Sequence, residues 1–299
     1  MMACEVFAIS FGLWRRHLAS ALPRRQPQGA TSAAAVAATG NKPQDLNAPA
    51  AVDEELERLA VQVLAVYQDP QVAQSCLTVL VQVGNADPWT LLQVMGKAAR
   101  RVDIGAAYAS SAIFVLVAFV QRSPGKVLPL LTRFTEAVLR CLEPSDPTLR
   151  RQSLMAVTSA LHELVNTFPM VDFHQQSQKF AVGTSDGRVV VYDLRTATKW
   201  RILEGHTGAV AGLAFAGDGN RLSSYSANDC SVRVWQTGSE GFLGGLLGSG
   251  KRCLKTQVLP PIDLLSGTSN GWRNVTLKWS DQGLKLVREN GDNLRIGID

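Results

Sequence analysis

The feature of this chain that most restricts its fold is a stretch within residues 179–236 that occurs about one and a half times. Each copy carries an aspartate in a turn and, after an alternating apolar segment, an aromatic residue. The turn residues Asp186 and Asp229 lie 43 residues apart, and so do the aromatic residues Tyr192 and Trp235. Because a repeat of about 40 to 45 residues is typical of one four-stranded blade, the period predicts a β-propeller architecture.

The residues between the two aromatic positions fit the strands and turns of a propeller blade of the WD type. Ala209–Phe215 alternates larger apolar residues with small ones, and Arg221–Tyr225 and Ser231–Gln236 predict the next two strands. The glycines, aspartate and asparagine at 217–220 supply the positive φ angles that a tight turn requires. The first copy has its own turn and strand markers, which are Asp186, Gly187, Tyr192 and Asp193.

Four residues of the second copy match the hydrogen-bonded chain of a WD repeat, in which buried polar groups pair with one another. This expected WD tetrad consists of His206, Ser224, Asp229 and Trp235. A Ser/His/Asp set could also indicate a hydrolase, but no nucleophile elbow or oxyanion feature accompanies it, so we expect a structural role and no enzyme. The second copy departs from the usual pattern at Cys230 and Gln236, and no Gly-His pair precedes the first copy.

Residues 53–168 predict about six helices, the first two at Glu54–Tyr67 and Gln71–Val83. Aspartate-proline pairs at 87–88 and 146–147 predict helix starts, because aspartate caps the first turn and proline needs no amide partner there. Short Pro-marked turns favour an α-solenoid of HEAT or armadillo kind, with a plain helical bundle as the alternative. Two apolar faces are expected to be buried: Val127, Leu130, Phe134, Val138 and Cys141, and Leu154, Val157, Leu161, Leu164 and Phe168.

The most apolar run of the chain is Ile113–Val120, which extends with Ala106–Ala112 to 15 residues. A helix needs about 20 apolar residues to span a bilayer, so we expect a buried central helix here. Any membrane association is then expected to be indirect, through a partner or the N-terminal tail.

The C-terminal part predicts an incomplete propeller of about two blades plus a degenerate third. Met170–His174 is expected to begin the first blade, and Leu254–Val258 to close the second as its outer strand. Asn274–Ser280 and Leu284–Arg288 predict a hairpin in the third blade. Two or three blades cannot close a propeller, so edge strands and a bare face are expected. The expected fold class is α+β multidomain, with α-solenoid helices followed by incomplete WD-type β-propeller blades.

The N-terminal segment differs from the rest and predicts a disordered basic leader, with an organelle transit peptide as the alternative. Five basic and two acidic residues at 1–50 account for more than half of the net charge of +5. Because the basic balance belongs mostly to this tail, we expect no nucleic-acid partner. The expected domains are the leader at 1–52, the helical solenoid at 53–168 and the partial propeller at 169–299.

Three sequence features that suggest cofactor chemistry are incomplete. Gly245–Lys251 resembles the start of a phosphate-binding loop, but Arg252 stands where serine or threonine would hold magnesium. His162-Glu163 lacks the second histidine of a helical zinc motif, and the five cysteines are scattered without a Cys-x-x-Cys pair. We therefore expect no cofactor, no metal and reduced thiols.

The motifs at 180–183, 191–196, 205–206, 214–219 and 235–236 together resemble the C-terminal end of the rabconnectin-3 beta family of WD-repeat proteins. This resemblance implies a non-enzymatic scaffold, cytoplasmic or peripheral on vesicles or endosomes. It also implies binding to rabconnectin-3 alpha and the vacuolar proton pump, and thus regulation of that pump with vesicle and endosome acidification or trafficking. The alternative is a generic WD-repeat adaptor of a ubiquitin ligase or trafficking coat, without a link to the pump.

Overall fold

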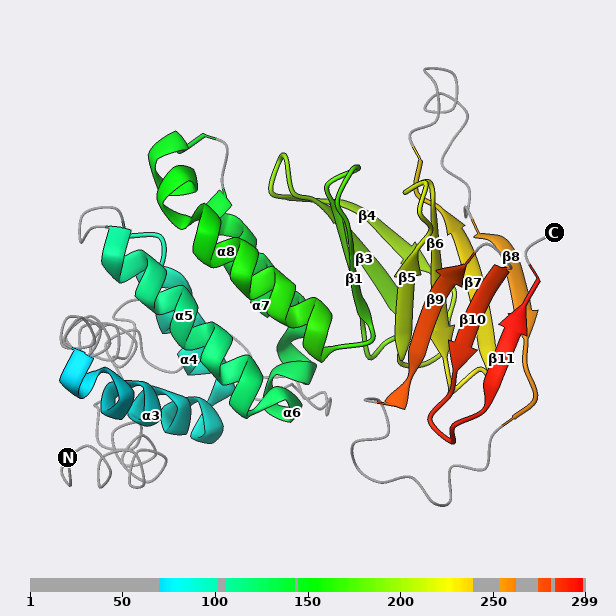
Figure 1. Cartoon of the computed structure of the whole chain (residues 1–299), viewed down its shortest axis with the longest axis horizontal. Helices are drawn as coiled ribbons and strands as arrows, with labels where there is room; N and C mark the ends of the chain where they lie inside the picture. The colour runs from blue at the N-terminus through cyan, green and yellow to red at the C-terminus, as the bar shows by residue number, and fades with distance from the viewer. Residues whose placement is uncertain are drawn as a thin grey trace, which may run out of the picture.

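The computed structural model describes residues 70–101, 106–142, 145–238, 253–261, 274–280 and 283–297. Figure 1 shows the helices at one end of the molecule and the sheets at the other. The two parts meet where α8 (Pro147–Thr167) leads into β1 (Val171–His174). The expected leader, the predicted helix at 54–67 and the phosphate-loop-like motif at 245–251 lie outside the described residues.

The helical part contains helices joined by short loops, and two of them begin where the aspartate-proline pairs predict. Asp87 and Asp146 are the N-caps of α4 and α8, accepting the amide hydrogens of Thr90 at 3.0 Å and Leu149 at 2.9 Å, as predicted. The assignment of these helices to a HEAT or armadillo solenoid stays a prediction. Besides α8, the elements are α3 (Pro70–Ala86), α4 (Pro88–Ala98), α5 (Ala106–Arg122), α6 (Pro124–Val127), η1 (Leu128–Leu130), α7 (Leu131–Leu139) and η2 (Arg140–Leu142).

The predicted buried faces are largely right, with two corrections. Leu154 is 50% exposed, because the buried stripe of α8 turns instead toward the small residues Ser153, Ala156 and Ala160, which allow α8 to pack against α5. The other face is divided among α6, η1, α7 and η2, and Leu130, in the 3-10 segment, is only partly buried.

The apolar run at 113–120 forms the middle of α5 and is buried except for Phe114, which is 43% exposed. This confirms the buried helix predicted there. In the described parts of the chain, no single helix has the length and hydropathy needed to cross a bilayer. Residues 107–122 and 124–142 meet those criteria only as a pair bent by 110°.

The described strands form three antiparallel sheets, which we call blades one, two and three. Their strand orders are β1-β2-β3-β4, β5-β6-β7-β8 and β11-β10-β9, and in Figure 1 blade one lies between the helices and the other two blades. The remaining strands are β2 (Lys179–Gly183), β3 (Arg188–Asp193), β4 (Thr198–Glu204), β5 (Gly212–Phe215), β6 (Arg221–Ser226), β7 (Ser231–Gln236), β8 (Cys253–Val258), β9 (Thr276–Ser280), β10 (Gly283–Val287) and β11 (Asn293–Ile296).

Two strands were not predicted, and both lie at the edge of a sheet. β4 pairs only with β3 and exposes several polar and charged side chains, so its sequence lacks a clean alternation of apolar residues. β11 has four residues and pairs only with β10. The hairpin predicted at 274–288 is confirmed as β9 and β10, with Leu277 opposite Leu286.

The helical part covers the face of blade one that a preceding blade would cover in a closed propeller. One apolar core runs from the helices into blades one and two. Glu136 of α7 accepts a hydrogen bond from the Tyr192 hydroxyl at 3.3 Å and forms an ion pair with Lys199 of β4 at 2.8 Å. Arg150 of α8 donates to the carbonyl oxygens of Leu142 and Leu194. The face that the sequence leaves bare at this end is therefore covered.

Candidate functional site

The structure brings the four residues of the expected WD tetrad into one continuous chain of hydrogen bonds. His206 lies in the loop between β4 and β5, and its Nε2 is 2.7 Å from Ser224 Oγ on β6. Its Nδ1 is 3.0 Å from Asp229 Oδ2 in the turn before β7. Trp235 of β7 donates its indole hydrogen to Ser224 Oγ at 2.7 Å. The tetrad thus ties one loop, one turn and two strands together.

The number of donors fixes where the protons of the tetrad lie. The indole nitrogen of Trp235 can only donate, so Ser224 Oγ accepts this bond. The ionised carboxylate of Asp229 can only accept, so Nε2 of the neutral His206 ring is left to accept the hydrogen of Ser224. His206 Nδ1 then carries the ring proton and donates it to Asp229. This tautomer orients every donor toward an acceptor, as a buried polar network requires.

Asp229 receives further hydrogen bonds that the sequence did not predict. The amide of Thr207 donates to Oδ2 at 3.1 Å, and the amide and hydroxyl of Ser231 donate to Oδ1 at 3.2 and 2.9 Å. The Ser231 hydrogen bonds could have been predicted from the sequence, because Ser231 lies only two residues after Asp229. With these donors, Asp229 joins the His206 loop to the β6–β7 turn.

The electrostatics of the site favour a neutral imidazole beside an ionised carboxylate. Burial lowers the pKa of His206 below its usual value, although the charge of Asp229 and its hydrogen bond act in the opposite direction. For Asp229, burial raises the pKa, but the hydrogen bond from Ser231 and the interactions with His206 and Thr207 outweigh it and lower the pKa overall. The pair is therefore held by a neutral-donor hydrogen bond near pH 7.

The geometry does not fit the hydrolase alternative. Ser224 has 0% of its surface exposed, and its oxygen is hydrogen-bonded to both Trp235 and His206. A nucleophile must reach a substrate carbon, and a fully buried hydroxyl that is hydrogen-bonded to an indole N–H cannot do so. The role of this arrangement is therefore structural: it holds blade two to the β4–β5 loop that precedes it.

The turn markers of blade one hold its β2–β3 turn and contact the His206 loop. Asp186 lies exposed and bonds the side chains of Thr184 and Arg188. Hydrogen bonds from both partners lower the pKa of Asp186 to about 2. Gly187 has a φ of +85°, and a Cβ placed there would lie 2.3 Å from the carbonyl oxygen of His206. The turn of blade one is thus packed directly under the loop that carries the tetrad histidine.

The strand-end markers of blade one form no tetrad of their own. Tyr192 is buried in the position that corresponds to Trp235, but its hydroxyl bonds Glu136 of α7 and not a neighbouring serine. Asp193 accepts hydrogen bonds from the backbone amide of Arg195 at 2.9 Å and from its guanidinium at 2.7 Å. These residues connect blade one to the helical part and tighten the β3–β4 turn.

Two comparisons with known proteins bear on this repeat. Residues 127–261 match the model of a β-propeller family described as Nucleolar protein 10-like, N-terminal domain. An uncharacterized WD repeat-containing protein of Synechocystis sp. is 33% identical over 75 residues, which are 25% of this chain and 21% of that protein. The C-terminal part of this chain is built of WD-repeat blades. The chain spans about a fifth of the length of this curated relative.

Solved propeller structures match part of this chain at low similarity. The β-propeller domain of Cps50 (Swd1) from Myceliophteria thermophila is 22% identical, with a TM-score of 0.29, over 40% of this chain and 31% of that chain. Hsv2 of Kluyveromyces lactis is 15% identical, with a TM-score of 0.32, over 43% of this chain and 42% of that chain. Membership of the rabconnectin-3 beta family stays a prediction.

The WD repeat of blade two keeps its shape despite its two departures from the usual sequence. Cys230 adopts a φ of +45°, the left-handed conformation for which a WD turn usually supplies glycine. Gln236, in place of the usual aspartate, lies at the end of β7 and is partly exposed. Among the described residues no group of three or more His, Cys, Asp or Glu side chains could hold a metal ion.

The tetrad predicts a pH dependence of stability. Because the folded-state pKa of His206 lies below its unfolded value of 6.5, the unfolded chain binds a proton first as the pH falls. The free energy of unfolding should therefore decrease as the pH falls through and below 6.5. Urea unfolding at pH 7.5 and 5.5 should show a smaller difference for His206→Gln than for the unmodified chain. His162→Gln, at an exposed position of α8, should retain the full difference; equal differences in both variants would contradict the assignment.

Proposed function

We propose that this WD-repeat chain is a non-enzymatic protein-interaction scaffold. The observation that carries this proposal is the structural use of its Ser/His/Asp set: Ser224 is fully buried, and its oxygen is hydrogen-bonded to both Trp235 and His206. Among the described residues, the surfaces available to partners include the edge strands β4, β8 and β11 and the exposed helix faces. WD blades and helical repeats typically use such edges and faces to bind proteins.

The finer proposal is a scaffold like rabconnectin-3 beta, with a HEAT- or armadillo-type solenoid before the blades. The motifs at 180–183, 205–206 and 235–236 support it, together with the order of helices before blades. On this proposal the partners are rabconnectin-3 alpha and the vacuolar proton pump, in the cytoplasm or peripherally on vesicles or endosomes. The runner-up is a generic WD adaptor of a ubiquitin ligase or trafficking coat.

The test is affinity purification of the full chain, tagged at its C-terminus, followed by identification of the proteins that co-purify. Recovery of the pump's peripheral sector together with the large alpha partner is the expected result. Recovery of ligase or coat subunits instead would favour the runner-up. Recovery of chaperones alone would contradict a scaffold function for this chain.

A parallel purification with Asp229→Ala assigns the partners to a part of the chain. This substitution removes the acceptor for Thr207, Ser231 and His206 and should loosen blade two while leaving the helices. Partners lost with this variant bind the blades or depend on them. Partners retained bind the helical part.

A further inference from the structure

The helical part contains a hollow of about 160 Å³ that is lined from α4 and α7. Three of the side chains that line it are guanidinium groups. They belong to Arg100, which follows α4, to Arg133 of α7 and to Arg140, the first residue of η2. We call this cavity with its three arginines the arginine hollow. Arg133 and Arg140 are exposed and Arg100 is half-buried, so a ligand can reach all three.

Small residues explain why the hollow exists. Gly96 of α4 and Ala137 of α7 both line it, and a Cβ at Gly96 would lie 3.4 Å from the Cβ of Ala137. Arg133 lies four residues before Ala137 and Arg140 three residues after it, so both share its helix face. The two helices therefore meet through residues that fill little space, and long cationic side chains flank the space that remains.

The three arginines are not used by acceptors of the described chain. Among the described residues, none of them forms an ion pair with a carboxylate or a side-chain hydrogen bond. Arg133 lies over the ring of Trp89, with its guanidinium carbon 4.8 Å from the ring centre. Such a contact uses the flat face of the guanidinium group and leaves its N–H edge for hydrogen bonds. Trp89 thus orients a donor beside the hollow without satisfying it.

The acidic side chain in the lining is already paired. Glu136 lines the hollow from α7, but its carboxylate forms an ion pair with Lys199 of β4 at 2.8 Å and accepts the hydroxyl hydrogen of Tyr192 at 3.3 Å. Its charge is therefore balanced from blade one. The three guanidinium groups remain an excess of positive charge at the hollow.

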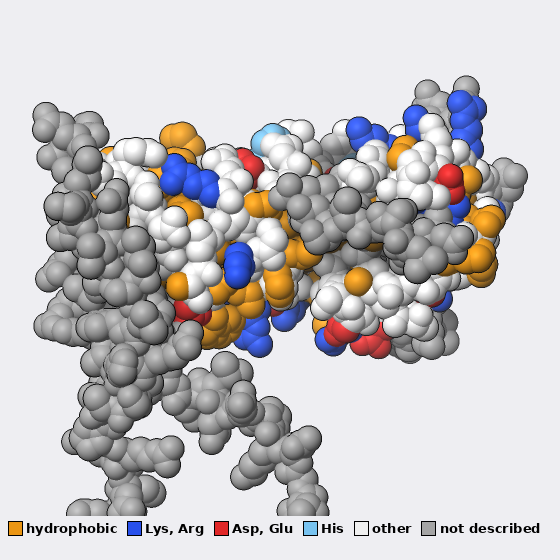
Figure 2. Space-filling model, turned by 90° about the horizontal axis from the view of Figure 1, so that it is seen from below, with side chains coloured by type: hydrophobic (Ala, Val, Ile, Leu, Met, Phe, Trp, Pro, Cys, Tyr) orange, Lys and Arg blue, Asp and Glu red, His pale blue; other side chains and the backbone are white. Residues whose placement is uncertain are grey.

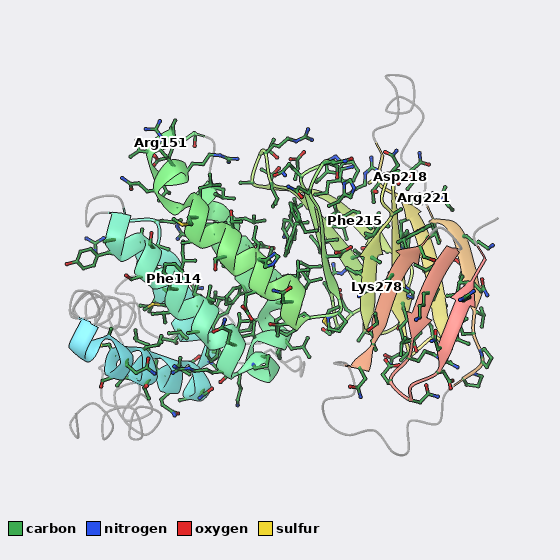
Figure 3. The ribbon with its side chains drawn as sticks, viewed as in Figure 1. Phe114, Arg151, Phe215, Asp218, Arg221 and Lys278 are labelled. Atoms are coloured by element: carbon green, nitrogen blue, oxygen red, sulfur yellow. The ribbon has the colours of Figure 1, made fainter. Side chains whose placement is uncertain are left out.

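A second surface with three arginines shows the contrast. Arg150, Arg151 and Arg195 line a wider depression at the start of α8. Arg150 donates to two backbone carbonyl oxygens, and Arg195 is bound to the carboxylate of Asp193. Figure 3 labels Arg151 on α8, and Figure 2 shows Lys and Arg side chains in separate groups at the helical end. Positive charge alone therefore does not distinguish a site, whereas a cavity with uncommitted guanidinium groups does.

Size and donor type identify the ligand. A volume of 160 Å³ is below the roughly 300 to 1,000 Å³ of pockets for drug-sized ligands, so the hollow suits one charged group and not a nucleotide. Guanidinium groups match phosphoryl oxygens with paired N–H donors. A phosphorylated serine or threonine supplies close to two negative charges and three acceptor oxygens on a short side chain.

We propose that the arginine hollow binds a phosphorylated serine or threonine side chain of a partner protein. This proposal deepens the scaffold function and rests on it. Arginine clusters are a recurrent means of recognising phosphorylated segments. A membrane surface is less well matched, because surface binding combines charge with inserted apolar side chains. None of the large, exposed apolar side chains among the described residues lines the hollow.

The test uses a mixture of short fluorescein-labelled peptides with phosphoserine at the centre and varied neighbours, titrated with the purified full chain and followed by fluorescence anisotropy. The phosphorylated mixture should bind about tenfold or more tightly than the same mixture without phosphate. Arg133→Gln combined with Arg140→Gln should remove this preference. An equal affinity for both mixtures in the unmodified chain would overturn the proposal.

The matched control combines Arg122→Gln with Arg151→Gln, which removes two charges at exposed positions of α5 and α8. This control should bind the phosphorylated mixture as the unmodified chain does. Glutamine is well tolerated in helices, and circular dichroism checks that both variants fold. An equal loss of binding in the control would overturn the proposal, because only overall charge would then matter.

A charge-conserving variant tests the geometry of recognition. Arg133→Lys combined with Arg140→Lys keeps both charges but loses the paired N–H donors, so binding should fall several-fold. Unchanged binding would contradict recognition by the guanidinium groups.

Two further probes distinguish the source of the phosphoryl group. Inorganic phosphate that competes at the concentration of the peptide itself would make the free ion the ligand and overturn the protein partner. Sedimentation with vesicles that contain a phosphoinositide, lost in Arg133→Gln with Arg140→Gln while peptides do not bind, would overturn the proposal in favour of a membrane.

The outcome also separates this proposal from the scaffold function. The peptide assay uses purified protein and does not depend on which proteins co-purify from cells. No preference for phosphorylated peptides, with partners still recovered, would overturn the role of the arginine hollow alone. Phosphopeptide binding without any recovered partner would count against the scaffold function and leave the phosphoryl site standing.

Discussion

Replacing Trp235 by alanine is expected to destabilise the chain by about 3 to 5 kcal/mol, the range for removing a large buried aromatic side chain. Trp235 is 1% exposed and is among the largest fully buried side chains. Its loss opens a cavity in the core shared by blades one and two and leaves Ser224 Oγ without its donor. Urea unfolding followed by circular dichroism measures the total loss. Amide exchange across 221–236 should show that the loss concentrates in blade two.

Trp235→Phe divides this loss into packing and hydrogen bonding. Phenylalanine keeps most of the ring but cannot donate to Ser224, so we expect a loss of about 1 to 3 kcal/mol. Ser224→Ala removes the same hydrogen bond from the other side and also the contact with His206. Losses below about 1 kcal/mol for both Trp235 variants would show that the tetrad does not stabilise blade two.

The parts of the fold that the sequence predicted well depend on local chemistry. Turn residues at 217–220 and 228–229 and alternation within 231–236 mark strands by themselves, and the 43-residue period then aligns two copies. The tetrad residues also follow from spacing, since the repeat dictates where a loop histidine meets a strand serine. The caps of α4 and α8 required only the aspartate-proline pairs.

The parts that it did not predict depend on contacts between distant segments. Tyr192 carries the aromatic signature of a repeat, but its hydroxyl bonds Glu136, 56 residues earlier, and no local pattern indicates that α7 packs there. Leu154 fits a helical stripe, yet the position of α5 decides which stripe of α8 is buried. The adjacency of Lys278, Lys285 and Arg295 on blade three cannot be seen in the sequence, because only the register of three strands places them side by side.

Gly187→Ala is expected to be the most damaging change of a single methyl group, with a loss of about 2 to 4 kcal/mol. Two effects combine. A φ of +85° is unfavourable for alanine by about 1 to 2 kcal/mol. The new Cβ would also lie 2.3 Å from the His206 carbonyl oxygen and 3.0 Å from that of Gly208, both backbone atoms that cannot move without the loop. The methyl group would therefore push the tetrad histidine away from Ser224 and Asp229.

Substitutions at two other glycines separate the cost of a positive φ from the cost of a steric clash with the new Cβ. Gly291 has a φ of +87°, and no atom lies within 4 Å of the position that a Cβ would occupy, so Gly291→Ala should cost only about 1 kcal/mol. Gly125 in α6 has open space and no left-handed φ, so Gly125→Ala should be neutral or slightly stabilising. If Gly187→Ala and Gly291→Ala lose the same free energy of unfolding, the contact between the turn of blade one and the His206 loop does not form. If only Gly187→Ala also loses the pH dependence between 7.5 and 5.5, that turn positions the tetrad from the neighbouring blade.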